Sequence, residues 1–154
     1  MEFGKSGSTV RAETSIESNF KSNREFRIDY VINVPTNKNL IVSNKYGNTV
    51  VNKLNANGDF DIQYGNISAN ELLAPANGKM NLNLAYGKGN IVTTGDINID
   101  ISYSNITLGT INDLQLESKY STVEFEKGRV IRVDSKYDKF SFGKVKSVTA
   151  TTKY

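Results

Sequence analysis

The sequence predicts an all-β fold, a single-domain parallel β-helix or β-solenoid with coils of about 17 residues. Three observations predict it: a tyrosine that returns at near-constant spacing, apolar residues that alternate with polar ones before each tyrosine, and the lack of any helical stripe. The tyrosines are Tyr46, Tyr64, Tyr86, Tyr103, Tyr120, Tyr137 and Tyr154. The gaps between these successive positions are 18, 22, 17, 17, 17 and 17. Four equal gaps in succession indicate stacked structural units.

The alternation before each tyrosine has the period of a β-strand. In one unit Ile97, Ile99 and Ile101 are separated by single polar residues, which predicts a strand with one buried face. A meander of antiparallel hairpins would also alternate, but it would not need units of one length. A parallel solenoid needs them, because each coil stacks on the previous one at about 4.7–4.9 Å. We therefore expect a solenoid, with a right-handed turn.

The residues before the first tyrosine predict N-terminal strands that cap the stack. Residues 10–16 and residues 26–34 both alternate between apolar and polar side chains, as strands do. A polar, turn-like stretch at 19–24 separates them, and residues 35–39 form the next turn. The repeat is expected to begin near residue 26.

Each unit continues past its tyrosine into a corner, a shorter strand and a second corner. Small or polar turn residues follow every tyrosine. The shorter alternations are Ile67-x-Ala69, Ile106-x-Leu108, Val123-x-Phe125 and Phe140-x-Phe142. The unit between Tyr64 and Tyr86 is the longest, and residues 74–78 hold its excess length. Pro75 cannot lie in a central strand, so the insertion is expected to form a corner loop.

We expect the domain to cover residues 9–154, with residues 1–8 as a linker or an added segment. Residues 1–8 contain no hydrophobic segment of the kind that a signal peptide needs. At the other end Lys153 and Tyr154 open another repeat, and no atypical capping unit follows. The array is therefore expected to be cut short at its C-terminus.

Composition excludes several kinds of active site. The 154 residues include no Cys and no His, which removes disulfides, thiolate and imidazole metal sites and the usual nucleophilic triads. The net charge of +3 comes from 19 basic and 16 acidic residues that are interspersed, so no nucleic-acid-binding patch is expected. No apolar run approaches the length of a membrane-spanning helix.

Carboxylate pairs are the remaining candidates for acid–base chemistry. The pairs are Asp59 with Asp61, Asp96 with Asp100, and Glu124 with Glu126. The first and last pairs fall on outward strand positions, where a solvated face explains them better than catalysis does. We therefore assign no catalytic, cofactor-binding or metal-binding residue, and expect no cofactor.

Stacking of the coils also predicts the surroundings of the tyrosines. Each tyrosine continues the phase of the buried apolar positions, so we expect Tyr46, Tyr64, Tyr86, Tyr103, Tyr120 and Tyr137 to form an internal structural ladder. The alternative is an exposed row that stacks on sugars or bases. An acidic row is expected three residues before the tyrosines, at Asp61, Asp100, Glu117 and Asp134. A basic row is expected one residue before them, at Lys45, Lys119, Lys136 and Lys153.

Two repeated segments and the lead-in to the first unit carry a family resemblance. The segments are Lys45-Tyr46-Gly47-Asn48 and the Ser-Lys-Tyr units at 118–120 and 135–137, with Asp29 to Pro35 as lead-in. They resemble the adhesin-like families of β-strand-repeat (β-solenoid) proteins in the bacterial cell envelope, over roughly residues 26–154. The resemblance implies an exported protein of the cell surface or periplasm, although members of these families carry an export signal that is not seen here.

The resemblance implies a non-enzymatic envelope protein, adhesin-like or a structural binding scaffold. The alternative is a carbohydrate-binding or carbohydrate-active β-helix protein, and a third interpretation is a spacer that associates with itself through the ends of the solenoid. The expected partner is a protein or glycan surface, and neither nucleic acid nor a membrane-spanning segment is expected. The candidate partner-binding loop comprises Glu71, Leu72, Leu73, Pro75 and Asn77.

Overall fold

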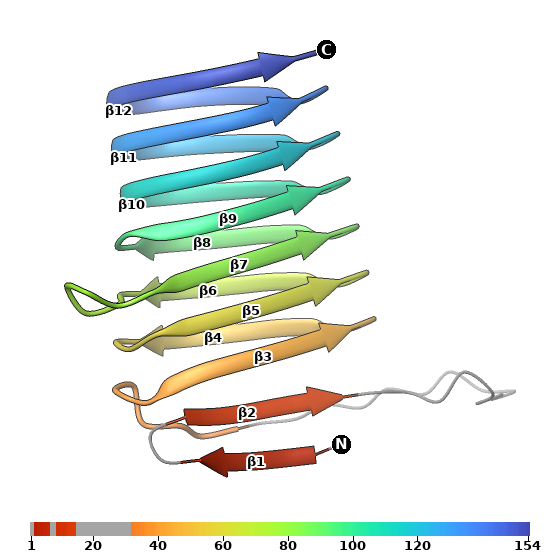
Figure 1. Ribbon diagram of the computed structural model, residues 1–154, viewed down its shortest axis with the longest axis vertical. Helices are drawn as coiled ribbons and strands as arrows, with labels where there is room; N and C mark the ends of the chain where they lie inside the picture. The colour runs from red at the N-terminus through yellow and green to blue at the C-terminus, as the bar shows by residue number, and fades with distance from the viewer. Residues whose placement is uncertain (1, 7–8, 15–31) are drawn as a thin grey trace, which may run out of the picture.

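The computed structural model describes residues 2–6, 9–14 and 32–154, and over these residues it is an all-β solenoid (Figure 1). The N-terminal strands lie at one end of the stack and the C-terminus at the other. The strands are β1 (Glu2–Ser6), β2 (Thr9–Thr14), β3 (Asn39–Lys45), β4 (Asn48–Leu54), β5 (Gly58–Gln63), β6 (Asn66–Leu72), β7 (Met80–Ala85), β8 (Lys88–Thr94), β9 (Ile97–Ser102), β10 (Asn105–Lys119), β11 (Thr122–Lys136) and β12 (Lys139–Lys153).

Every coil crosses two parallel sheets. The first sheet stacks β2, β3, β5, β7 and β9, and continues with residues 114–119, 131–136 and 148–153 of the three longest strands. The second sheet stacks β4, β6 and β8, and continues with residues 105–111, 122–128 and 139–145. In β10, β11 and β12 the chain passes from the second sheet to the first without a break in the strand.

Pairing between coils follows the tyrosine spacing. Leu40 pairs with Gly58 and Gly58 pairs with Met80, and these offsets equal the gaps between the first three tyrosines of the repeat. From Ile97 onward the partners are Leu114, Ile131 and Val148, at the same constant spacing as the later tyrosines. A meander of hairpins would pair antiparallel, so the parallel solenoid is confirmed.

The coil is right-handed, as expected. In Figure 1 the nearer strands β3, β5, β7 and β9 run to the right, the farther strands β4, β6 and β8 run to the left, and the chain climbs towards the C-terminus. This is the hand that crossover connections between parallel strands adopt almost without exception.

The core lies between the two sheets and consists of every second side chain. Ile97, Ile99 and Ile101 are at most 3% exposed in the first sheet, and Ile106 and Leu108 face them from the second sheet at no more than 2%. Each fully buried side chain of this size contributes about 1.5–3 kcal/mol relative to exposure. The alternation therefore assigned the buried face of these strands correctly.

The N-terminal predictions are confirmed only in part. The strand expected at 10–16 is observed over residues 10–14 as part of β2, and residues 15 and 16 lie outside the described residues. β1 pairs antiparallel with β2, so both strands extend the first sheet beyond β3. The expected turn at 19–24 and residues 26–31 lie outside the described residues. Residues 32–34 are not in a strand, which corrects that part of the prediction for 26–34. The turn after Pro35 is observed, because the Lys38 N–H donates to the Pro35 carbonyl at 3.1 Å.

Candidate functional site

The tyrosine ladder points outward, which corrects the expectation of an internal ladder. The six tyrosines from Tyr46 to Tyr137 are 43–65% exposed. Each has a positive φ between 50° and 65°, the left-handed region that few non-glycine residues adopt. This conformation ends the alternation: Ile101 is buried, Tyr103 turns to solvent, and the next residue, Ser104, is only 4% exposed. The corner, and not the strand, determines where the rings point.

Stacking between the rings is present as expected. Successive ring centroids are 4.8–5.2 Å apart and the ring planes differ by no more than 18°. Because the rings cover each other's faces, the inner rings expose their edges and hydroxyl groups. A sugar or base that stacks needs a free ring face, so the ladder is poorly suited to that alternative. Lys45 and Lys119 place Nζ 5.3 Å and 5.6 Å from the centroids of Tyr46 and Tyr120.

Truncating one inner ring is expected to destabilise the protein moderately. Tyr103→Ala removes stacking contacts with Tyr86 and Tyr120, at about 0.5–1.5 kcal/mol per pair. Because the ring is 48% exposed, the loss should be about 1–2 kcal/mol, below the roughly 3–5 kcal/mol typical of a buried aromatic residue. Urea unfolding followed by circular dichroism measures it. A loss above about 3 kcal/mol would instead indicate a ring that packs in the core.

A matched glycine variant separates the ring from the backbone. Tyr103→Gly removes the same ring but tolerates the φ of 50° without the roughly 1–2 kcal/mol strain of an L-residue. We expect it to be more stable than Tyr103→Ala by about 1 kcal/mol. An equal or lower stability would mean that the corner does not hold this conformation in solution.

The residue after each tyrosine forms a second column, inside the corner. It is glycine at 47, 65 and 87, serine at 104 and 121, and aspartate at 138. The Gly87 N–H donates to Ser104 Oγ at 3.0 Å, and the Ser104 N–H donates to Ser121 Oγ at 3.2 Å. The Ser121 N–H donates to Asp138 Oδ1 at 2.6 Å. These side chains satisfy backbone donors of the preceding coil, so we interpret the column as structural.

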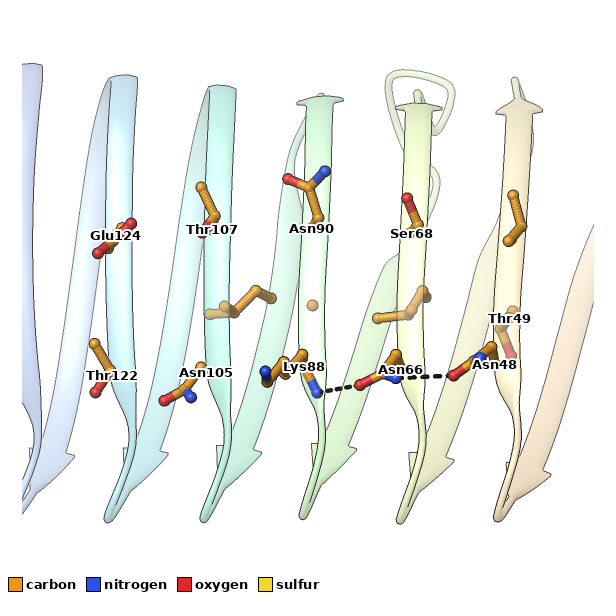
Figure 2. A pocket seen from close by; sticks show the side chains of 14 residues that line it. Asn48, Thr49, Asn66, Ser68, Lys88, Asn90, Asn105, Thr107, Thr122 and Glu124 are labelled. Atoms are coloured by element: carbon orange, nitrogen blue, oxygen red, sulfur yellow. Dashed lines mark hydrogen bonds between the residues drawn. The ribbon is translucent and has the colours of Figure 1, made fainter.

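A trough crosses the outer face of the second sheet. Two rows of outward side chains form its walls and the backbone between them forms its floor (Figure 2). One wall comprises Asn48, Asn66, Lys88, Asn105 and Thr122; the other comprises Val50, Ser68, Asn90, Thr107 and Glu124. The trough has a volume of about 710 Å³. It spans β4, β6, β8, β10 and β11, so it is roughly 19 Å long at the spacing between strands.

The walls of the trough carry amide and hydroxyl side chains apart from Val50 and two charged residues, whereas most of the exposed surface inside the trough is apolar. Lys88 and Glu124 are the charged residues among those that line it, and they belong to opposite walls. Asn66 Nδ2 donates to Asn48 Oδ1 at 2.8 Å, and the Lys88 N–H donates to Asn66 Oδ1 at 3.0 Å. This partial ladder fixes the amide orientations. The other amide and hydroxyl groups of the walls can donate hydrogen bonds to an uncharged polar ligand and accept hydrogen bonds from it.

A smaller hollow of about 250 Å³ lies near the second corner. Its charged lining residues are Lys79, Asp96, Asp113 and Arg132. The acids next to it are engaged: Arg129 Nη2 bonds Asp113 Oδ2 at 2.5 Å, and Asn112 Nδ2 donates to Asp96 Oδ1 at 2.5 Å. Asp113 Oδ1 is buried and has no partner. The cluster ties three successive corners together and offers no free acid–base pair.

The carboxylate pairs weighed from the sequence lie on the surface. Asp59, Glu124 and Glu126 are exposed and Asp61 is half-buried, as outward strand positions require. Asp100 pairs in register with Glu117 along the expected acidic row, and Lys119 pairs with Lys136 along the basic row. Within residues 2–6, 9–14 and 32–154, no three His, Cys, Asp or Glu side chains gather closely enough to hold a metal ion.

The inserted loop projects from the second corner, between β6 and β7 (Figure 1). Leu73, Pro75 and Asn77 are exposed there, and the Gly78 N–H closes a turn on the Pro75 carbonyl at 2.7 Å. Leu72 is 0% exposed and belongs to the core, so it is not accessible to a partner. Glu71 bonds Lys53 Nζ at 2.6 Å. The accessible part of the candidate loop is therefore residues 73–77.

Comparisons of the chain with protein-family models, with curated proteins and with solved structures found no match. No helix capable of crossing a membrane is present among the described residues.

Proposed function

We propose that this protein is a non-enzymatic, adhesin-like binding scaffold that holds an extended polymer in the trough of its second sheet. The observation that carries the proposal is the continuity of the trough over five stacked strands, with two walls of mostly polar side chains that repeat at the coil spacing. A ligand that lies along the axis meets a similar set of amide and hydroxyl groups at each step. A chain of repeating polar units fits this arrangement better than a compact small molecule does.

The trough chemistry supports an uncharged glycan chain as the ligand. The Asn90 and Asn105 side chains can donate and accept at once, which suits the hydroxyl groups of sugars. One carboxylate, Glu124, lines the trough, whereas glycoside hydrolysis usually uses two carboxylates about 5–9.5 Å apart. Binding without cleavage is therefore the proposal, and a location on the bacterial surface or in the periplasm belongs to it.

A glycan array with variant proteins tests the proposal. Asn90→Arg fills the centre of the trough and should weaken glycan binding by about tenfold or more. Asn83→Arg is the matched control, because Asn83 is exposed on the outer face of the first sheet, in the acidic row between Asp61 and Asp100. We expect it to bind like the unaltered protein.

Two results would contradict the proposed function. Equal loss of binding in both variants would place the site elsewhere, and shorter sugar products in the incubation mixture would show an enzyme. Chromatography of the glycan after prolonged incubation measures the second directly.

A further inference from the structure

Backbone hydrogen bonds hold the ladder tyrosines of neighbouring coils together, in addition to the contacts between their rings. The Tyr103 N–H donates to the Lys119 carbonyl at 2.9 Å, one residue before the next tyrosine. Equivalent bonds of 2.9–3.1 Å are made by Tyr46, Tyr64, Tyr86, Tyr120 and Tyr137. All six residues share the left-handed φ, and their rings stack nearly parallel. Each phenol is therefore held beside the next one by the fold itself.

The edges of the ladder rings are open to reagents in solution. The rings are 43–65% exposed, and neighbouring rings cover the faces of the inner ones. Solvent therefore reaches the ring edges, where the hydroxyl oxygen and the ortho carbons beside it lie. These are the atoms through which a tyrosine reacts after it has lost an electron, so the stacking leaves the reactive part of each ring accessible.

Few other side chains of this protein compete with the tyrosines for a one-electron oxidant. The sequence contains no Cys and no Trp, the residues that would compete most strongly. Met80 is only 1% exposed, and oxidation of methionine gives a sulfoxide, which forms no link between residues. Six of the eight tyrosines belong to the ladder. An oxidant that acts on this chain therefore acts mainly on rings that already lie side by side.

We propose that the ladder is a site of oxidative cross-linking, at which two successive tyrosines of one chain join as dityrosine. The oxidant is hydrogen peroxide, used by a haem peroxidase that removes one electron and one proton from each of the two phenols. The two phenoxyl radicals form a carbon–carbon bond between their ortho carbons. The hydrogens on these carbons then move as protons to the phenol oxygens, which restores both aromatic rings. The two electrons and two protons removed from the phenols reduce one hydrogen peroxide to two water molecules.

The geometry favours coupling between successive rings over any other pairing. Their centroids are 4.8–5.2 Å apart, so rotation about the side-chain bonds of two rings can bring their ortho carbons together. Second neighbours are about 10 Å apart, twice the strand spacing, and have a ring between them. Groups held side by side also react at far higher effective concentrations than groups on separate molecules. The product ties two coils covalently, in a chain that has no cysteine for a disulfide.

Two variants that keep equal numbers of tyrosines test the proposal. The contiguous variant keeps three successive ladder tyrosines and carries Tyr46→Phe, Tyr120→Phe and Tyr137→Phe. The alternate variant keeps every second ladder tyrosine and carries Tyr64→Phe, Tyr103→Phe and Tyr137→Phe. Both also carry Tyr30→Phe, so that they differ only in whether the remaining phenols are neighbours. Phenylalanine preserves the stacked rings, and circular dichroism checks that both variants are folded.

Each protein is treated with a haem peroxidase and hydrogen peroxide at low protein concentration. Dityrosine fluorescence is then measured in the band that remains monomeric on a denaturing gel. The unaltered protein and the contiguous variant should both give dityrosine in this band, and the alternate variant should give at least about tenfold less because its phenols are not held together. Mass spectrometry of the digested unaltered protein should find the cross-link between peptides that carry successive ladder tyrosines.

Three results would overturn the proposal. The first is an equal yield of dityrosine in the monomer bands of the two variants, because adjacency would then not matter. The second is dityrosine found only in dimers and larger species, which would show coupling between molecules. The third is a lack of dityrosine in the unaltered protein while free tyrosine in the same reaction mixture couples.

Discussion

Ile99→Asp is expected to unfold the protein. Ile99 is 2% exposed and its partners in the two neighbouring strands are Leu82 and Leu116, at 2% and 1%. A carboxylate at this point would have neither water nor a cation beside it. The effective penalty for burying an unpaired charge is several kcal/mol, which is comparable to the whole stability of a typical domain, about 5–15 kcal/mol. Loss of the strand signal in circular dichroism at room temperature measures it.

Asp100→Asn is the control for this prediction. Asp100 is the next residue and is exposed, so the change should alter the free energy of unfolding by no more than about 0.5 kcal/mol. Both substitutions lie in β9, but Ile99 faces the core whereas Asp100 faces solvent. If both were equally destabilising, the assignment of buried and exposed faces would be wrong.

The strands could be predicted because the sequence repeats a strong local signal. Alternation between Ile97 and Ile101 identifies one buried face, and the return of the same phase at a constant spacing identifies the stacking partner. Few other ways of pairing the strands keep both the buried face and the constant spacing. The insertion at 74–78 could also be placed, because Pro75 and the excess length exclude a continuous strand.

The direction of the tyrosines could not be predicted from the same signal. In the sequence Tyr103 continues the alternation of Ile99 and Ile101. Its φ of 50° turns the backbone, however, so the side chain at 103 no longer points to the buried face. Glycine or asparagine usually marks such a position, whereas tyrosine does not. The turn residues that follow indicated a corner, yet they did not indicate which residue takes the left-handed conformation.

The trough was not predicted because its residues are ordinary when read along the chain. Asn66, Ser68 and Asn90 are polar outward residues of short strands, with no spacing that suggests a site. They form a continuous surface because β6 and β8 lie side by side in register.

Gly65→Ala is expected to destabilise the protein by about 1–3 kcal/mol, the range for an overpacked site. A Cβ on Gly65 would lie well inside contact distance of the Gly47 carbonyl oxygen, a backbone atom that cannot rotate away. Tyr64 and Tyr46 are stacked beside this contact, so the two corners cannot separate without loosening the ladder. Thermal unfolding followed by circular dichroism, together with the exciton signal of the stacked tyrosines, measures both effects.

Gly95→Ala is the control, because the nearest atom to a Cβ there is 3.8 Å away and its φ lies outside the left-handed region. It should leave stability unchanged or raise it by about 0.4–1 kcal/mol through the less flexible unfolded chain. A silent Gly65→Ala would mean that this corner can adopt the conformation of Ser104. That outcome is not expected, because Ser104 is tied to the preceding coil by its Oγ, which accepts from the Gly87 N–H at 3.0 Å. Alanine brings the Cβ without that oxygen, so the clash has no compensating hydrogen bond.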